Sequence, residues 1–421
     1  MSNFLYGIDF GTSNSVLSIF DEDKNEIIST ISVPSILYFP DEYDPALPLI
    51  YHVGNQAINS YIHDGMKGRF MKSIKRVLPR TNFIETRIHN KSFNAAGLVT
   101  LIIKDLKTKA DAIIGYDCKK AIIGRPVYFD DDNTLNDSIA QKRLTQAAQQ
   151  AGLDQIRFQY EPIGAAFAYE KTISKKEKVL VADLGGGTTD FTFIELDPLK
   201  RMVKDRRNDI LATGGIYIGG DSFDSAFMWD RGTPYFGRGV MYESMPGKMV
   251  DVPPSFFSNI CSWEKMNFFN GLKVQNDLRQ YYSYSKQNEK IKNLITLTEN
   301  NLGYSVFQSI EKTKVDLSEK SMSHFSYDKI DIHIDEAISL NDYNKIIDKD
   351  LSKIKNYLES FLAKNNIAPE SIDTLFLTGG TSMVHAVQSL FKSTFPHTAI
   401  KSDDNFISVA KGLAYSGYLF E

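Results

Sequence analysis

The chain has 421 residues, 42% hydrophobic and 24% charged, which is typical of a globular protein and long enough for two or three domains. Its formal net charge of −4 at pH 7 gives no electrostatic reason to expect a nucleic-acid partner, and no apolar run is long enough to span a membrane. Only Cys118 and Cys261 occur as cysteines, so the sequence indicates neither a disulfide framework nor a zinc site, and we expect a cytoplasmic location.

The first predicted element is a glycine-rich hairpin. Apolar alternation predicts strands over residues 4–10 and 15–20, with Asp9 near the end of the first. Glycine lets the backbone amides of a tight turn approach phosphate oxygens, and hydroxyl side chains add donors. The turn therefore favours a phosphate-binding loop, although an ordinary β-hairpin has similar features. Its residues are Gly11, Thr12, Ser13 and Asn14.

A basic segment follows between residues 67 and 80. Because the chain as a whole is slightly acidic, we interpret this segment as a local, solvated stretch that contains one functional lysine. Its cations are Lys67, Arg69, Lys72, Lys75, Arg76 and Arg80.

The next elements alternate between strand and helix. Residues 121–129 predict a buried strand that stops at Pro126, because proline cannot donate to a sheet ladder. Residues 137–150 predict a polar helix, and residues 161–169 predict a helix rich in small side chains. Small side chains allow helix axes to approach closely, so we expect this second helix to pack tightly on a neighbour.

A second glycine-rich hairpin repeats the first. After a charged break at residues 175–178, which we predict to be a lobe boundary, strands are expected over 179–183 and 191–196. Two such hairpins in one chain make an ordinary β-hairpin a poor explanation for both. They favour a nucleoside triphosphate as ligand. Mg²⁺ tolerates few carboxylates, so Asp9 and Asp183 would hold it through water. The second loop carries Asp183, Gly185, Gly186, Gly187, Thr188 and Asp190.

The middle of the chain is rich in aromatic residues. A turn at Gly219 and Gly220 precedes them. We favour a buried core for an enlarged subdomain, because aromatic side chains usually bury, and a docking surface for a protein partner is the alternative. The residues are Trp229, Tyr235, Phe236, Tyr242, Phe256, Phe257, Trp263, Phe268 and Phe269.

The last third predicts a long amphipathic helix and a third glycine turn. Apolar residues at helical spacing between Tyr343 and Phe361 mark one helix face. A strand over 375–378 then meets Gly379 and Gly380, after which a new helix begins. A helix N-terminus beside a glycine turn favours an anion nearby.

Together these motifs resemble the ATPases of the actin, hexokinase and heat-shock chaperone superfamily. The similarity is greatest to the nucleotide-binding domain of DnaK-type chaperones, and among these to the YegD-type homologues without a substrate-binding domain. The resemblance implies an α/β chain with an actin-like, two-lobed ATPase fold, each lobe holding a ribonuclease-H-like mixed sheet flanked by helices. We expect lobe I over residues 1–176, with 404–421 packing back on it, and lobe II over 177–403, with an aromatic-rich insert at about 225–300.

The resemblance also implies roles for individual residues. The candidate catalytic residues are Lys75, Glu161, Asp183, Asp9 and Asp190. The candidate residues for binding ATP or ADP are Gly11, Thr12, Ser13, Asn14, Gly185, Gly186, Gly187, Thr188, Gly219, Gly220, Glu311, Lys314, Gly379, Gly380 and Met383. Mg²⁺ would be held through water by Asp9, Asp183 and Glu161, with K⁺ as a further candidate ion. Simpler alternatives remain open, because Glu161 could merely cap its helix and Glu311 and Lys314 could pair on a solvated face.

The sequence departs from the family pattern at two places. Met383 and Val315 replace residues that are basic in many relatives, which predicts weaker adenine binding. The chain also ends at Glu421, before the linker and the client-binding β-sandwich of a full chaperone.

We therefore expect slow, Mg-dependent ATP hydrolysis coupled to opening and closing of the lobes. The protein would be a chaperone-like or regulatory ATPase, with a nucleotide exchange factor and a client protein as candidate partners. An actin-like filament-forming ATPase and a small-molecule kinase, which would need an aspartate base facing a hydroxyl substrate, are the alternatives.

Overall fold

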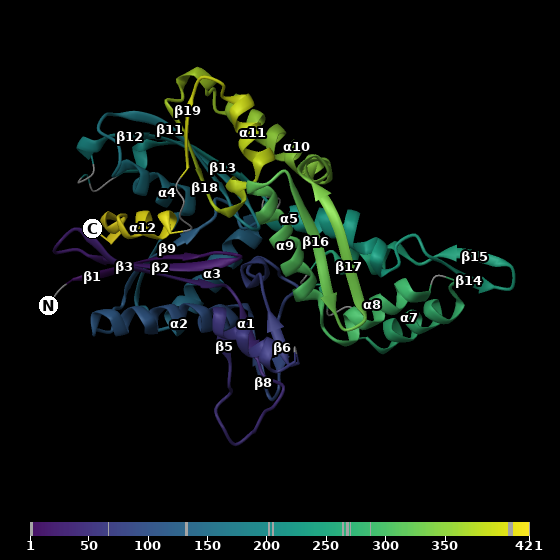
Figure 1. Ribbon diagram of the computed structural model, residues 1–421. Helices are drawn as coiled ribbons and strands as arrows, with labels where there is room; N and C mark the ends of the chain where they lie inside the picture. The colour runs from purple at the N-terminus through teal and green to yellow at the C-terminus, as the bar shows by residue number, and fades with distance from the viewer. Residues whose placement is uncertain are drawn as a thin grey trace.

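The computed structural model describes residues 3–65, 67–130, 134–200, 203, 206–262, 265–266, 269, 271–286, 288–402 and 407–420. Two five-stranded sheets lie in two lobes, and helices flank both (Figure 1). The two-lobed, actin-like α/β fold expected from the sequence is confirmed. The division at residue 176 remains a prediction, and the predicted boundary at 403 and 404 falls outside the described residues.

The sheet of lobe I has the strand order β10-β9-β1-β2-β3. β1 pairs antiparallel with β2 and parallel with β9, so the first phosphate hairpin is the centre of this sheet. The predicted strands over 4–10 and 15–20 are confirmed, and the predicted strand at 121 ends just before Pro126. The five strands are β1 (Phe4–Phe10), β2 (Asn14–Asp21), β3 (Glu26–Pro34), β9 (Lys120–Arg125) and β10 (Gln155–Tyr160).

The sheet of lobe II repeats this arrangement in the order β13-β12-β11-β18-β19. β11 pairs antiparallel with β12 and parallel with β18, so the second hairpin takes the same central place as the first. The two phosphate hairpins therefore belong to one structural unit that the chain uses twice. Its strands are β11 (Glu177–Leu184), β12 (Thr189–Leu196), β13 (Ile210–Ile216), β18 (Thr374–Thr378) and β19 (Ala399–Ser402).

Smaller strands and the helices surround the two sheets (Figure 1). The smaller strands are β4 (Leu37–Phe39), β5 (His52–Val53), β6 (Arg69–Met71), β7 (Thr86–Ile88), β8 (Lys91–Phe93), β14 (Met241–Met245), β15 (Lys248–Asp251), β16 (Met322–Lys329) and β17 (Ile332–Ser339). The α-helices are α1 (Gly54–His63), α2 (Ala95–Ile114), α3 (Thr134–Gln150), α4 (Glu161–Glu170), α5 (Gly220–Phe227), α6 (Pro254–Ile260), α7 (Leu272–Tyr284), α8 (Asn288–Glu299), α9 (Gly303–Glu319), α10 (Leu340–Lys364), α11 (His385–Thr394) and α12 (Ser408–Ala414).

One predicted helix start differs from the structure. The turn at Gly379 and Gly380 leads into a four-residue 3-10 turn, Gly380–Met383, and α11 begins only at His385. The long helix predicted between Tyr343 and Phe361 is α10, which buries Tyr343, Ile354 and Leu358 on one face as its periodicity indicates.

Helices α4 and α12 cross between the two sheets with their backbones in contact. α4 packs on β11 and β12 of lobe II, whereas α12 packs on β1, β2 and β9 of lobe I. At the crossing, a Cβ atom on Gly412 would overlap the carbonyl oxygen of Gly164, and a Cβ atom on Gly164 would lie 2.9 Å from the carbonyl oxygen of Val409. The close packing expected for the small-residue helix is therefore confirmed, and the lobes join through this crossing.

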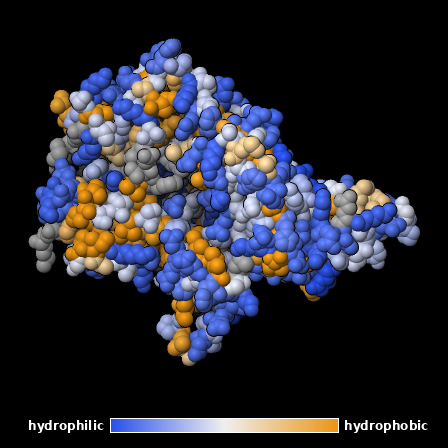
Figure 2. Space-filling view, in the orientation of Figure 1, coloured by the Kyte–Doolittle hydropathy of each residue, from blue (hydrophilic) through white to orange (hydrophobic). Residues whose placement is uncertain are grey.

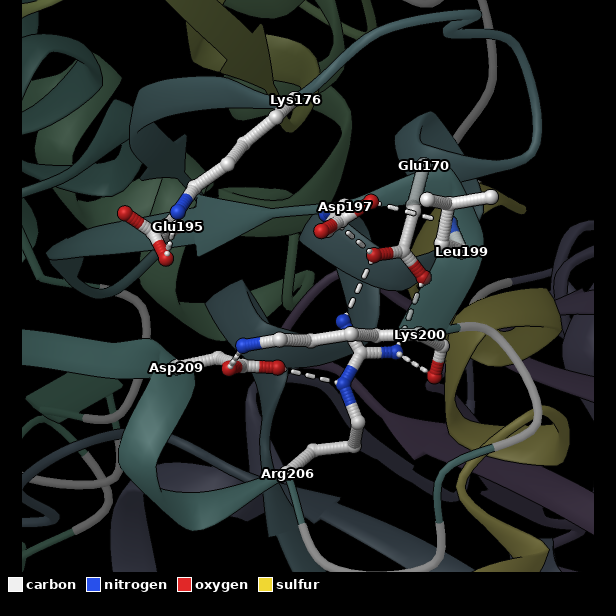
Figure 3. A network of polar contacts seen from close by, with 8 residues as sticks. All are labelled: Glu170, Lys176, Glu195, Asp197, Leu199, Lys200, Arg206 and Asp209. Carbon is white, nitrogen blue, oxygen red and sulfur yellow. Dashed lines mark hydrogen bonds and ion pairs between the residues drawn. The ribbon is translucent and has the colours of Figure 1, made fainter.

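A buried charge cluster holds the other end of α4 (Figure 3). The guanidinium of Arg206 donates to Glu170 at 2.6 and 3.0 Å and to Asp209 at 2.5 Å, and Lys200 donates to Asp209 at 2.6 Å. Arg206 also lies over the ring of Phe167, 5.0 Å from its centroid. Because Arg206, Glu170 and Asp209 are all buried, the cluster fastens the β12–β13 connection to α4.

The aromatic-rich segment forms mainly a core. Phe236, Phe256, Phe257 and Phe269 are buried, and Tyr235 and Tyr242 pack against the same cluster. Trp229 is 39% exposed, and Trp263 and Phe268 lie outside the described residues. The hairpin β14–β15 projects from this part of the molecule, and its visible face is predominantly hydrophilic (Figures 1 and 2). These observations favour the core interpretation over an aromatic docking surface.

We predict that Gly412→Ala destabilises the protein because its new methyl group overlaps the α4 backbone. Overpacking of this kind costs about 1–3 kcal/mol, and more where backbone cannot move. Urea unfolding followed by circular dichroism measures the change. Gly97→Ala in α2 is the control, because its added Cβ would meet its nearest neighbours at 3.4 and 3.5 Å. Equal midpoints for the two variants would contradict the predicted overlap.

We predict that Arg206→Met lowers the free energy of unfolding by about 3–5 kcal/mol, because two buried carboxylates lose their shared cation. The matched control is Lys176→Met, which breaks an ion pair with Glu195 at 2.7 Å (Figure 3). The Lys176 side chain is 55% exposed, so its loss costs at most about 1 kcal/mol. Thermal unfolding of both variants tests the difference, and similar losses would contradict a buried cluster.

Candidate functional site

Three glycine turns from both lobes meet in one cleft. A Cβ atom on Gly186 would lie 2.6 Å from Ser13 Oγ, so the two phosphate loops face each other at closest approach. The Gly379 turn reaches the same place, where the hydroxyl of Thr381 donates to the carbonyl oxygen of Gly185 at 2.8 Å. Gly379 has a φ of +80°, and a Cβ there would lie 2.8 Å from Asp183 Oδ1. A side chain at Gly186 or Gly379 would therefore collide with neighbouring atoms, and the positive φ of Gly379 also favours glycine.

Lys75 and Glu161 form a buried ion pair at the base of the cleft. Lys75 lies on a 3-10 turn of lobe I, Ile74–Val77, and Glu161 is the first residue of α4. Lys75 Nζ donates to Glu161 Oε1 at 2.6 Å, and both side chains are at most 10% exposed. Glu161 thus does more than cap its helix, because it balances the charge of the buried Lys75 ammonium.

Burial shifts the protonation of the carboxylates around this pair. Burial raises the pKa of Asp183 to about 8, with the Glu161 and Asp190 carboxylates adding to the shift. Burial likewise raises the pKa of Asp190 to about 7 and raises that of Asp9 well above its ordinary value. Burial opposes the charge on Lys75, but Glu161 and Asp9 outweigh it, so the pKa of Lys75 is raised and its ammonium stays charged. The charged Lys75 ammonium therefore faces three carboxyl groups, those of Asp9, Asp183 and Asp190, whose pKa values are raised.

Three further contacts connect the two lobes beside the cleft. Asp190 Oδ1 accepts a hydrogen bond from the backbone N–H of Val127 at 3.1 Å. Arg76 Nε lies 3.6 Å from Asp221 Oδ2, and the Arg76 guanidinium lies 5.5 Å from the centroid of the Tyr217 ring. These contacts run from lobe I to the second hairpin, Tyr217 and α5, so they connect the two lobes across the cleft.

The predicted nucleoside end of the cleft holds a second buried ion pair. Lys314 Nζ donates to both carboxylate oxygens of Asp224, at 2.8 and 3.0 Å. Burial opposes the charge on Lys314, but Asp224 and Glu311 outweigh it and raise its pKa. Lys314 therefore pairs with Asp224 rather than with Glu311 on a solvated face. Val315 also lines the cleft and is 56% exposed.

The cleft encloses about 190 Å³, and most predicted site residues line it. Asp190, Gly219 and Met383 are not among its described lining residues, and Met383 is 46% exposed. The lining also contains residues that the sequence reasoning did not single out as site residues. Two of them, Asp221 and Thr381, directly follow recognised glycine turns, and Thr378 is the last residue of the strand predicted over 375–378. The predicted residues in the lining are Asp9, Gly11, Thr12, Ser13, Asn14, Lys75, Glu161, Asp183, Gly185, Gly186, Gly187, Thr188, Gly220, Glu311, Lys314, Gly379 and Gly380, and the additional ones include Lys72, Asp221, Asp224, Thr378, Thr381 and Val409.

The residues of the cleft fit a phosphate chain and a hydrated Mg²⁺. The glycines of these turns carry no side chain that would shield their backbone amides from a phosphate. Thr12, Ser13 and Thr188, which line the cleft, provide hydroxyl donors. Within the described residues, no group of three His, Cys, Asp or Glu side chains is placed to bind a metal ion directly. Mg²⁺ usually keeps several waters, so Asp9 and Asp183 fit a water-mediated site better than direct coordination by a cage of carboxylates.

We predict a pH-dependent effect of Asp183→Asn on stability. Folded Asp183 keeps its proton up to about pH 8, whereas the unfolded group has a pKa of 3.8. The native state therefore loses relative stability as pH rises between these values, and the variant avoids this loss. Its free energy of unfolding relative to the unmodified protein should rise by at least about 1 kcal/mol, roughly one pKa unit, from pH 5 to pH 9. Urea titrations at both pH values measure it. Asp348→Asn, at an exposed position, should give a flat difference, and a fall for Asp183→Asn would contradict the prediction.

None of the helices in the described part of the chain combines the length and apolar character needed to cross a membrane.

Comparisons with known proteins agree with this architecture. The family model described as "Hsp70 protein" matches residues 51–229 and 270–420. Among similar curated proteins, the chaperone protein DnaK of Thermotoga petrophila is 27% identical, and that of Thermosipho melanesiensis is 26% identical, each over 98% of this chain and 58% of its own length. The DnaK of Cyanidium caldarium is 24% identical over 98% of this chain and 60% of its own length. The chain thus spans less than two thirds of these relatives, and the family match over most of its residues shows that it belongs to the Hsp70 family.

Proposed function

We propose that this chain binds ATP with Mg²⁺ and hydrolyses it slowly, coupling hydrolysis to opening and closing of the lobes. The observation that carries the proposal is the meeting of both phosphate loops, the Gly379 turn and Lys75 in one cleft built from both lobes. Family membership supports the same activity, because it connects this cleft with chaperones named DnaK.

Binding of a triphosphate requires the closed cleft to rearrange. Its 190 Å³ is smaller than the roughly 300–1,000 Å³ of ordinary ligand pockets. The Lys75–Glu161 pair lies at its base, and the two phosphate loops approach so closely that a Cβ atom on Gly186 would lie 2.6 Å from Ser13 Oγ. We infer that the phosphates separate the two loops and draw Lys75 away from Glu161, so that ligand binding and lobe position are coupled.

Each charged residue then has a distinct role in hydrolysis. Lys75 would exchange Glu161 for the γ-phosphate and offset its charge, which is the main contribution a protein makes to phosphoryl transfer. Glu161, released from this ion pair, would orient the attacking water and accept its proton. Asp9 and Asp183 would hold the water shell of Mg²⁺, which when bound neutralises charge on the phosphates. Asp190, bonded to Val127 and to the side chain of Thr188, would position the second loop.

We also propose that the ATPase acts as a chaperone-type or regulatory module with a protein client and an exchange factor. Two observations support this proposal: the chain is similar to chaperones named DnaK, and it has two lobes. Movement of the lobes would change the surface that a partner protein binds. Described aromatic residues such as Trp229 and Tyr284 are exposed on the insert and are candidates for such contacts.

We predict that Lys75→Ala and Asp183→Asn each lower the rate of ATP hydrolysis by about 100-fold or more, because the first removes the cation that offsets the γ-phosphate charge and the second removes a carboxylate that would hold the water shell of Mg²⁺. A phosphate-release assay on the purified chain with Mg²⁺ and ATP measures the rate, and calorimetry measures nucleotide affinity separately.

The matched control is Lys107→Ala. Lys107 is also a buried, paired lysine of lobe I, donating to Asp111 at 2.6 Å and to Asp117 at 2.5 Å, but it does not line the cleft. It should retain hydrolysis at a temperature where the variant is folded. Unchanged hydrolysis in both Lys75→Ala and Asp183→Asn would show that the site is wrongly assigned.

A further inference from the structure

Lys72 is a cation of the nucleotide cleft that the sequence reasoning did not select as a site residue. The cationic residues of the described lining are Lys72, Lys75 and Lys314. Two of them are already paired, because Lys75 donates to Glu161 at 2.6 Å and Lys314 donates to both carboxylate oxygens of Asp224. Lys72 forms no hydrogen bond or ion pair with any residue in the described part of the chain. Among the cations of this described lining, it is therefore the one that a ligand can bind before any ion pair breaks.

The surroundings of Lys72 explain why it has no partner. Burial raises the pKa of Asp224, and the charges of Lys314 and, less strongly, of Lys72 oppose this rise. The Lys72 ammonium therefore lies within electrostatic range of the Asp224 carboxylate. Lys314 already donates to both oxygens of that carboxylate, at 2.8 and 3.0 Å. Because Lys72 is half-buried, its ammonium is partly desolvated without a counter-ion, which favours binding of an anion there.

The backbone around Lys72 places two lysines of one short segment at different depths. Lys72 directly follows β6, and Lys75 lies on the 3-10 turn Ile74–Val77. Between them Ser73 has a φ of +56°, a left-handed conformation that residues other than glycine seldom adopt. The chain turns sharply at this residue. Lys75 is consequently buried at the base of the cleft, whereas Lys72 is half-buried in its wall.

Lys72 also lies where three hollows of the molecule meet. It lines the nucleotide cleft, a pocket of about 410 Å³ between the lobes, and a small hollow beside Asp224. No other described residue lines all three. The cleft itself encloses only about 190 Å³. A nucleotide that approaches the cleft from the larger pocket therefore meets Lys72 at the boundary, before it reaches Lys75 or Lys314.

We propose that Lys72 captures the phosphates of the incoming Mg-nucleotide before the cleft rearranges. This inference rests on the proposed function and adds a first step to it. The Lys72 ammonium binds the terminal phosphate while Lys75 still donates to Glu161. The phosphate loops then separate, and Lys75 exchanges Glu161 for the phosphate. Lys72 is thus a residue for nucleotide binding, and Lys75 acts in the later step.

An unpaired cation in this position acts mainly on the rate of association. Carboxyl groups outnumber lysines in the described lining, so the cleft repels a phosphate chain until a cation offsets the repulsion. Replacing a charge at the rim of a binding site changes the association rate constant and its salt dependence, whereas breaking a buried ion pair changes the dissociation rate constant. Loss of the Lys72 charge should therefore slow nucleotide association most at low ionic strength, where screening is weakest.

Stopped-flow fluorescence of the full chain with N-methylanthraniloyl-ATP and Mg²⁺ tests the proposal. Lys72→Gln should lower the association rate constant at least about threefold at low ionic strength, and the difference should shrink as salt is added. Lys72→Arg keeps the charge and should restore the rate constant to within about twofold. Lys104→Gln is the matched control, because it removes the same charge from an exposed position on α2 that does not line the cleft, and it should leave the rate constant unchanged. Thermal unfolding checks that each variant is folded.

The outcomes separate this inference from the proposed function. Nucleotide association at the unmodified rate in Lys72→Gln would overturn capture by Lys72. An equal loss in Lys104→Gln would overturn it too, because net charge alone would then explain the effect. A loss confined to the dissociation rate constant, or an equal loss in Lys72→Arg, would also contradict it. Failure of the unmodified chain to bind the nucleotide would instead contradict the proposed function, and this inference with it.

Discussion

The contact of Gly164 with Gly412 is the constraint on which the arrangement of the lobes depends. α4 packs on the sheet of lobe II and α12 on that of lobe I, and their backbones touch where neither residue has a side chain. The same approach continues at Gly7 of β1, where a Cβ atom would lie 2.5 Å from the backbone nitrogen of Ala414. The close contact of α4 with α12 fixes the distance between the two sheets at this point. The crossing of these two helices is narrow. Rotation about this crossing is the simplest way for the cleft to open.

A buried ion pair holds each end of α4. Its first residue, Glu161, pairs with Lys75 of lobe I, and its last, Glu170, pairs with Arg206 in lobe II. The two pairs have different surroundings. Arg206 is saturated by Glu170 and Asp209, which makes that end a fixed anchor. At the other end one lysine faces Glu161, Asp9 and Asp183, and the pKa values of both aspartates are raised, first by burial and then by the neighbouring Glu161 carboxylate. A cation or a phosphate-bound metal would offset the charge of these carboxylates, so this end is suited to exchange of partners.

The two hairpins and the close-packed helix α4 could be predicted from the sequence, because the patterns that indicate them lie in neighbouring residues. The hairpins at residues 7–15 and 181–190 combine strand periodicity with glycine turns, and the helix starting at Glu161 combines small residues with a proline in its first turn. Asp221 and Thr381 were less visible, since their role depends on hydrogen bonds to the second loop, formed by the backbone of Asp221 with Gly186 and by the hydroxyl of Thr381 with Gly185. The start of α11 was misplaced because a short 3-10 turn intervenes after Gly380, which residue preferences do not distinguish from an α-helix.

The sequence by itself determined the two glycine-rich hairpins, because turn chemistry and periodicity are properties of neighbouring residues, and its resemblance to a known family predicted the two-lobed fold. Only the tertiary structure decided which charges pair. Lys314 pairs with Asp224, 90 residues away, and not with Glu311 one turn away, while Lys75 pairs with Glu161, 86 residues away. It also decided that the basic segment lines a pocket between the lobes with Phe70 and Met266. Ion pairs and pocket walls join residues distant along the chain, and their partners are set by packing of the lobes.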